Sequence, residues 1–288
     1  RGFGQADPAA KVDATRGMGD FVDDAVTLMD HLGHDRFHLV GNSLGGVTAW
    51  WMLADHSERI LSVTQADPGS PYGFGGTKNA TGTPTTDDFA GSGGGLINPE
   101  LVRLISEGDT STDSMFSPRA ALRSLVWKPP FIPDREDEYV AALLQTHLGE
   151  DAYPGDKVVS PNWPFVAPGD MGVNNALSPK YALDVSRMVG AAAKPPVLWV
   201  RGAQDLAVSN NAASDPGSWG PMGLVPGYPG AETYPPQPML DQIRKALDDY
   251  TATGGRYEEV VIDDCGHVPF IEKPEEFDKV FHAQLANG

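Results

Sequence analysis

The chain has 288 residues, of which 40% are hydrophobic and 21% charged, the balance of an ordinary globular protein. Its net charge of −18 argues against nucleic acid and anionic membrane surfaces as partners, because both would repel it at long range. No apolar run approaches the ~20 residues that span a bilayer. The single cysteine, Cys265, excludes an internal disulfide and a zinc site built on paired thiolates. These features leave the cellular compartment open, with the cytoplasm slightly favoured over secretion.

The first part of the chain predicts alternating helices and strands. Apolar residues form a helical stripe from Gly19 to Leu32, and Gly33 follows as a terminator. A short buried strand is predicted at 37–40, a helix at 47–54 and a second buried strand at 60–66, which ends at Asp67 and Pro68. This alternation predicts a mostly parallel sheet with flanking crossover helices, an α/β fold.

The middle of the chain has a different character. Residues 73–95 are rich in Gly, Thr, Ser and Asp, as in a mobile loop, and helices are predicted at 99–106, 118–126 and 136–148 with no strand between them. Sheet-like sequence resumes at 196–200 and 258–262, with helices at 239–250 and 274–285. We therefore expect a core domain in two parts, 1–69 and 191–288, interrupted by a helical cap at 70–190.

The pentapeptide Gly41-Asn42-Ser43-Leu44-Gly45 has the form G-x-S-x-G and joins the strand at 37–40 to the next helix. A sharp strand-to-helix turn requires small neighbours, and Gly41, Gly45 and Gly46 fit that need. Such a turn holds the serine hydroxyl clear of the backbone and directs free amide N–H groups of the helix start toward it. The pattern predicts a nucleophilic serine at position 43.

A serine hydroxyl needs a base to take its proton, and that base is normally an imidazole held by a carboxylate. Asp205 follows the strand at 196–200, and His267 follows the strand at 258–262. Because the carboxyl ends of parallel strands lie along one edge of a sheet, these residues and Ser43 are expected to converge. Asp67 also follows a strand and is an alternative to Asp205 as the acid; Asp205 is favoured.

Four motifs, in this order along the chain, resemble those of the α/β-hydrolase superfamily. The resemblance covers all of the chain except the middle lobe, residues 70–190, and a loop near 210–238. The four motifs are Arg1-Gly2-Phe3-Gly4, the segment 41–46, Arg201-Gly202-Ala203-Gln204-Asp205, and Gly266-His267-Val268-Pro269 with Glu272-Lys273-Pro274 behind. The resemblance implies that Ser43 is the nucleophile, His267 the base and Asp205 its orienting acid. It also implies that the Leu44 N–H is one oxyanion donor. No metal or organic cofactor is required.

Acyl transfer to water is then the expected reaction, with a small-molecule carboxylic ester or lactone as substrate. A carbon–carbon bond hydrolase of the meta-cleavage type is the alternative enzyme, although such relatives commonly have tryptophan where this chain has Val268. A ligand receptor of the same fold with negligible turnover is the alternative outside catalysis.

Specificity is expected to come from the middle lobe. Four of its aromatic residues are candidates to wall an apolar pocket over the serine: Trp127, Phe131, Trp163 and Phe165. Such residues form the core of a lobe equally often. The loop from Ser214 to Pro238 is another candidate wall or a dimer contact, but a surface excursion is the expectation there.

Relatives have further strands and a second oxyanion N–H upstream of the Arg-Gly-Phe-Gly element, which here occupies positions 1–4. One missing oxyanion donor costs roughly 2.7–4 kcal/mol of transition-state stabilisation. Without a neighbour, the strand before Ser43 would also form an apolar sheet edge. We therefore expect an N-terminal segment of the same precursor to complete the sheet, as a partner polypeptide or as part of a longer chain.

Overall fold

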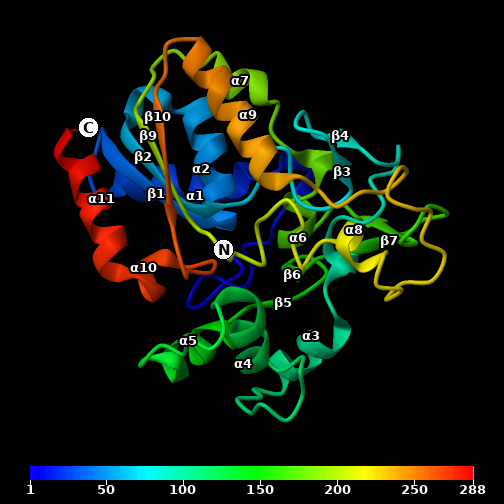
Figure 1. Ribbon diagram of the computed structural model, residues 1–288. Helices are drawn as coiled ribbons and strands as arrows, with labels where there is room; N and C mark the ends of the chain where they lie inside the picture. Colours follow the sequence, from blue (N-terminus) through cyan, green and yellow to red (C-terminus); the bar gives the residue numbers. More distant parts are fainter. Residues whose placement is uncertain (288) are drawn as a thin grey trace.

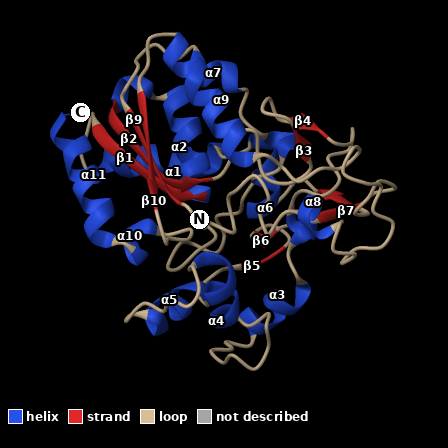
Figure 2. Cartoon of the chain, viewed as in Figure 1, coloured by secondary structure: helices blue, strands red, loops and turns tan. Residues whose placement is uncertain are grey.

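In the computed structural model, which describes residues 1–287, four parallel strands form the central sheet (Figures 1 and 2). Their order is β1-β2-β9-β10, with bounds β1 Phe37–Ser43, β2 Ile60–Pro68, β9 Val197–Gly202 and β10 Tyr257–Ile262. Each strand begins within one residue of the predicted start and ends within three residues of the predicted end. The parallel sheet predicted from the alternation of helices and strands is confirmed.

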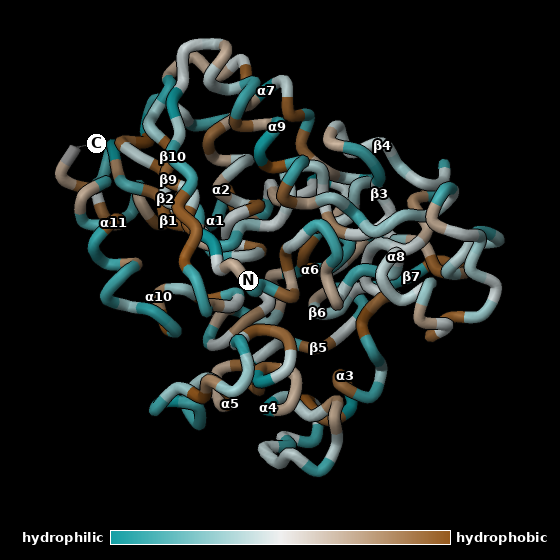
Figure 3. The backbone as a smooth tube through the Cα atoms, viewed as in Figure 1, coloured by the Kyte–Doolittle hydropathy of each residue, from teal (hydrophilic) through white to brown (hydrophobic). Residues whose placement is uncertain are grey.

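Helices cover both faces of this sheet (Figure 1). Side chains from α1 (Gly19–His31), α2 (Leu44–Asp55), α7 (Val185–Val189) and α9 (Met239–Ala252) form a core on one face. The other face packs against α11 (Pro274–Asn287), which follows the short helix α10 (Pro269–Glu272). The first four residues of β9, at 197–200, are all apolar and buried because they serve both cores, and Figure 3 shows hydrophobic stretches within the strands of the sheet.

Alternation along β9 divides its side chains between the two layers. Val197 and Trp199 belong to the core on the α2 face, whereas Leu198 and Val200 belong to the core on the α11 face. Helix α1 ends as the sequence predicts, since Gly33 adopts a φ of 74° directly after it.

Strand β1 lies at one edge of the sheet. Within residues 1–287 its only strand neighbour is β2, and the side chain of Val40 is 50% exposed. The further strands expected beside β1 stay a prediction.

The long connection between β2 and β9 contains the predicted helices. They are α3 (Pro99–Ser106), α4 (Pro118–Ala121), which continues as a π-helix at Leu122–Val126, and α5 (Glu136–Leu143). It also contains short strands that the sequence analysis missed, paired as β3 (Thr77–Lys78) with β4 (Thr83–Pro84), β5 (Leu148–Gly149) with β6 (Tyr153–Pro154), and β7 (Lys157–Val159) with β8 (Val166–Pro168). Strands of two or three residues are too short to show a period.

The last part of this connection packs on the core. Helix α6 (Val173–Ala176) contacts the N-terminal segment, and Leu183 and Met188 are buried in the core with α2 and α9. The division at residues 70 and 190 stays a prediction, and the packing shows that the chain returns to the core before residue 190. Single turns of 3₁₀ helix lie at Ala14–Arg16, Ser57–Arg59, Gly94–Leu96 and Pro179–Tyr181.

The segment 214–238, which includes α8 (Pro216–Trp219), is anchored in the interior at its two ends, whereas residues 221–233 between them are mostly exposed, so the expected surface excursion describes only that middle stretch. Asp215, Tyr234 and Gln237 are buried, and the Gln237 side chain accepts the Gly75 N–H and donates to the Gly73 carbonyl. Its many glycines and prolines suggested a surface loop, but buried polar contacts hold it in place. None of the helices described is long and apolar enough to cross a membrane.

Candidate active site

The turn between β1 and α2 has the strained geometry that the G-x-S-x-G pattern predicts. Ser43 adopts a φ of 53°, which non-glycine residues rarely do, and α2 begins at Leu44. A Cβ on Gly41 would lie 2.5 Å from the Gly45 carbonyl oxygen, and a Cβ on Gly46 would overlap Pro68. A Cβ on Gly45 would meet nothing within 4 Å, so the close crossing requires the first and last of these glycines.

Ser43 is partly exposed, and among the residues described its hydroxyl has no hydrogen-bond partner. The first amides of α2, including the Leu44 N–H, have no acceptor within the helix, which is the arrangement that favours an anion at a helix start. The role of Leu44 as an oxyanion donor stays a prediction.

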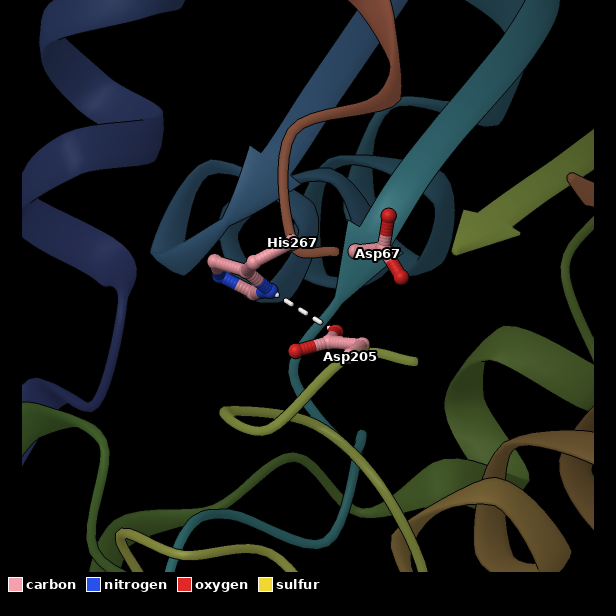
Figure 4. Close-up of side chains that lie close together, drawn as sticks. All are labelled: Asp67, Asp205 and His267. Atoms are coloured by element: carbon pink, nitrogen blue, oxygen red, sulfur yellow. Dashed lines mark hydrogen bonds and ion pairs between the residues drawn. The ribbon is translucent and has the colours of Figure 1, made fainter. Parts of the chain in front are cut away.

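Asp205 and His267 come together beside the turn between β1 and α2, which we call the elbow (residues 41–46), as Figure 4 shows. The imidazole Nδ1 lies 2.8 Å from Asp205 Oδ2, and both side chains are almost fully buried, with 6% and 2% exposed. The other oxygen of Asp205 accepts the N–H groups of Ala207 and Val208 at 2.7 and 3.1 Å. These bonds fix the carboxylate in the orientation that faces the histidine.

The histidine loop is tied both to the elbow and to the middle lobe. Asn42, which precedes the serine, donates its amide hydrogen to the His267 carbonyl at 3.1 Å, and the His267 N–H donates to the Val126 carbonyl at 2.9 Å. Glu272 accepts the N–H groups of Gly266 and Lys128. The sequence analysis missed these anchoring roles, although Asn42 and Glu272 both lie inside the motifs it singled out.

Asp67, the alternative acid, lies at the end of β2 and is also buried, with 1% exposed. Both of its carboxyl oxygens lie 3.1–3.2 Å from the Gly202 N–H. The nearest carboxyl oxygens of Asp67 and Asp205 and a ring nitrogen of His267 lie within 4.8 Å of one another. Burial, followed by the charge of Asp205, raises the pKa of Asp67 well above its ordinary value.

The group of Asp67, Asp205 and His267 has the ligand types of a metal site, but its atoms are directed at each other and at backbone N–H groups. Cys265 is fully buried, and burial raises the pKa of its thiol.

An apolar cavity of about 250 Å³ lies between the middle lobe and the core. Ser43, Asp205 and His267 do not line this cavity, and its walls are connected to them only through neighbouring residues. Leu125 precedes Val126, which holds His267; Leu177 packs in the same hydrophobic cluster as Leu44. Ser214 donates to the Ala207 carbonyl, next to Asp205. The remaining lining is mostly apolar: Phe74, Gly93, Leu96, Ile97, Asn98, Leu101, Asn174, Ala213 and Trp219.

The four aromatic residues considered as pocket walls have other neighbours, and their role in a pocket over Ser43 stays a prediction. Trp127 is buried against Tyr139, and Phe131 borders shallow surface hollows near Glu272 and Lys273. Trp163 packs against Tyr228 and Tyr234, and Phe165 is half exposed. None of the four lines the 250 Å³ cavity, whereas Trp219 of the 214–238 segment does.

Comparison with known proteins agrees with this architecture. Residues 1–92 match the family model described as the alpha/beta hydrolase fold. The fold also matches a serine hydrolase from the polyaromatic-hydrocarbon-degrading bacterium Cycloclasticus zankles, at 15% identity over 97% of this chain and 75% of that one, with a TM-score of 0.53. The chain therefore has the α/β-hydrolase fold.

Two further solved structures share the fold at low identity. A structure reported with the carboxylesterases of the thaumarchaeon Nitrososphaera gargenis matches at 15% identity over 99% of this chain and 77% of that one, with a TM-score of 0.51. A bacterial membrane phospholipase A matches at 20% identity over 99% of this chain and 67% of that one, also with a TM-score of 0.51. These likenesses show the fold, and the reaction must be argued from the site.

Proposed function

We propose that this protein is a serine hydrolase that cleaves carboxylic esters or lactones through an acyl-enzyme. The observation that carries the proposal is the buried 2.8 Å contact between His267 and Asp205, at the sheet edge where the strained turn presents Ser43. A histidine held in this way by a carboxylate is the base that a serine nucleophile requires.

The mechanism follows from the direction of each group. With Nδ1 facing Asp205, the imidazole accepts the Ser43 proton at Nε2 as the serine oxygen attacks the substrate carbonyl. The Leu44 N–H at the start of α2 stabilises the oxyanion that forms. His267 then donates its proton to the leaving alcohol, and water attacks the acyl-enzyme by the reverse path.

The apolar cavity between the middle lobe and the core supports a hydrophobic acyl or aryl group on the substrate. Its volume of about 250 Å³ lies below the range of roughly 300–1,000 Å³ typical of drug-sized ligands. We therefore expect short or medium acyl esters to be better substrates than long-chain ones.

Substitution of the proposed triad tests the reaction. Ser43→Ala and His267→Ala should each reduce kcat for a short aryl ester by about 10⁴-fold or more, because the triad acts as a unit. Asp205→Asn should also be severe. Two exposed residues of the same types provide matched controls, Ser106→Ala and His31→Ala, which should leave kcat unchanged.

Covalent labelling provides a second readout. A fluorophosphonate should add once to the wild-type chain at Ser43 and should not add to Ser43→Ala. Undiminished hydrolysis in either triad variant, or labelling at another serine, contradicts the mechanism. Binding of an ester without turnover in the wild type would favour a receptor instead.

A further inference from the structure

A second buried carboxyl group lies beside the proposed triad. Asp67 is the last residue but one of β2, which lies between the strand that leads to Ser43 and the strand that leads to Asp205, and its φ of 42° places it in the left-handed region. Such a conformation is costly for a non-glycine residue and is kept only where the surroundings determine it. The triad mechanism alone gives Asp67 no function.

The nearest oxygens of these two buried carboxyl groups lie within 4.8 Å of each other, and at that distance a charge on one group favours a proton on the other. Hydrogen-bond donors decide which group keeps it. Asp205 accepts two backbone N–H groups and faces the imidazole, and each of these donors favours its charged form. Asp67 has one backbone donor, the Gly202 N–H, shared between its two oxygens. The proton therefore belongs on Asp67.

Among the residues described, no cation near Asp67 reverses this preference for a proton on Asp67 over Asp205. The titratable groups that face Asp67 are Asp205 and Arg201 from β9 and its loop, and Cys265 and His267 from the loop after β10. The Arg201 guanidinium is paired with Glu259 at 2.7 Å, which offsets its charge. Burial and the Asp205 charge outweigh the effects of Arg201 and the Gly202 N–H, so the pKa of Asp67 is raised.

We propose that Asp67 is a positioning residue: as a neutral carboxylic acid it donates a hydrogen bond to Asp205 and so holds that carboxylate against His267. This inference rests on the proposed hydrolase function. Asp205 then has four donors, which is the capacity of a carboxylate, and the negative charge of the pair stays on the group that faces the imidazole. Asp67 does not touch the reacting atoms.

Two substitutions of Asp67 distinguish a hydrogen-bond donor at this position from a negative charge there. Asp67→Leu has a similar shape but no donor, and we expect it to lower kcat for an aryl ester by about tenfold or more with little change in KM. Asp67→Asn returns a neutral donor to the same place and suits the left-handed backbone. It should restore kcat to within about threefold of wild type and leave the acid limb of the kcat/KM profile where it was.

The opposite pattern overturns the proposal. If Asp67 were ionised, Asp67→Asn would remove a negative charge beside the histidine, move the acid limb to lower pH and lower kcat as far as Asp67→Leu does. Should Asp67→Leu fail to fold, Asp67→Asn and its pH profile still decide the question.

Infrared spectroscopy tests the proton without any turnover. With ¹³C-labelled aspartate, the wild type at neutral pH should show the carbonyl stretch of a buried protonated carboxyl group, and Asp67→Asn should lose it. A wild-type spectrum without that band, or a band that survives in Asp67→Asn, contradicts the shared proton. The band present in a protein that hydrolyses no ester would instead contradict only the proposed function.

Discussion

Asp215 is a buried acid that makes stability depend on pH. Its side chain is fully buried, and its carboxylate accepts the Gln237 N–H at 2.8 Å. Burial raises its pKa to about 6. Because the folded pKa lies above the unfolded one, the stabilising effect is present below the unfolded value of ~3.9 and is lost as pH rises toward about 6.

Asp215→Asn removes this titration. The difference between about 6 and ~3.9 corresponds to about 3 kcal/mol, so the free energy of unfolding of the variant should gain about that much relative to wild type between about pH 4 and pH 7. Urea unfolding at several pH values measures the gain. The exposed Asp113→Asn is the control, and an offset for Asp215→Asn that does not change with pH would contradict the prediction.

At the residue scale, the sequence predicts those candidate catalytic residues that a local motif or a strand end marks. Ser43 follows from the glycine spacing, and the positions of Asp205 and His267 follow from the strand ends. The proton on Asp67 depends on burial and on the distance between two strand ends, which the spacing does not give. The roles assigned to these residues stay predictions until the substitutions are made.

At the scale of elements, the close crossing at the elbow predicts that alanine has different effects on stability at its three glycines. Gly46→Ala should lower the free energy of unfolding by about 2 kcal/mol or more, because the new Cβ would overlap Pro68 across the crossing of α2 and β2. Gly41→Ala should be similarly destabilising. Gly45→Ala is the matched control: it has room, and alanine favours the helix over glycine by up to about 1 kcal/mol.

Thermal unfolding of the three variants distinguishes them without reference to activity. Equal losses at all three positions would mean that the backbone conformation, rather than the close crossing, requires glycine there.

The sequence predicted long elements better than short ones. Helices α3 and α9 begin at the predicted residues, because an apolar stripe and a proline or a capping residue mark each start. The paired strands of two or three residues carry no such signal. The two ends of the 214–238 segment were misjudged because Asp215 and Gln237 are polar, and only the folded chain provides the partners that let them be buried.

At the scale of the whole molecule, the cavity depends on segments far apart in the chain, from Phe74 to Trp219. Leu125→Trp should fill it and raise KM for a medium-chain ester by about tenfold or more relative to an acetyl ester. Leu28→Trp, at an exposed position on α1, is the control and should leave the ratio unchanged. Equal effects of Leu125→Trp on both esters would mean that the substrate does not enter this cavity.

The hydrogen bond between the Val126 carbonyl and the His267 N–H has a consequence for how ligands enter and leave. A lid that swung outward at this segment would pull on the loop that carries the base, and the bond from the Lys128 N–H to Glu272 would have to break with it. Movement of the segment that contains Val126 is therefore coupled to the position of His267. In the proposed mechanism, substrate and product must therefore pass through parts of the cavity rim that leave the loop of His267 in place.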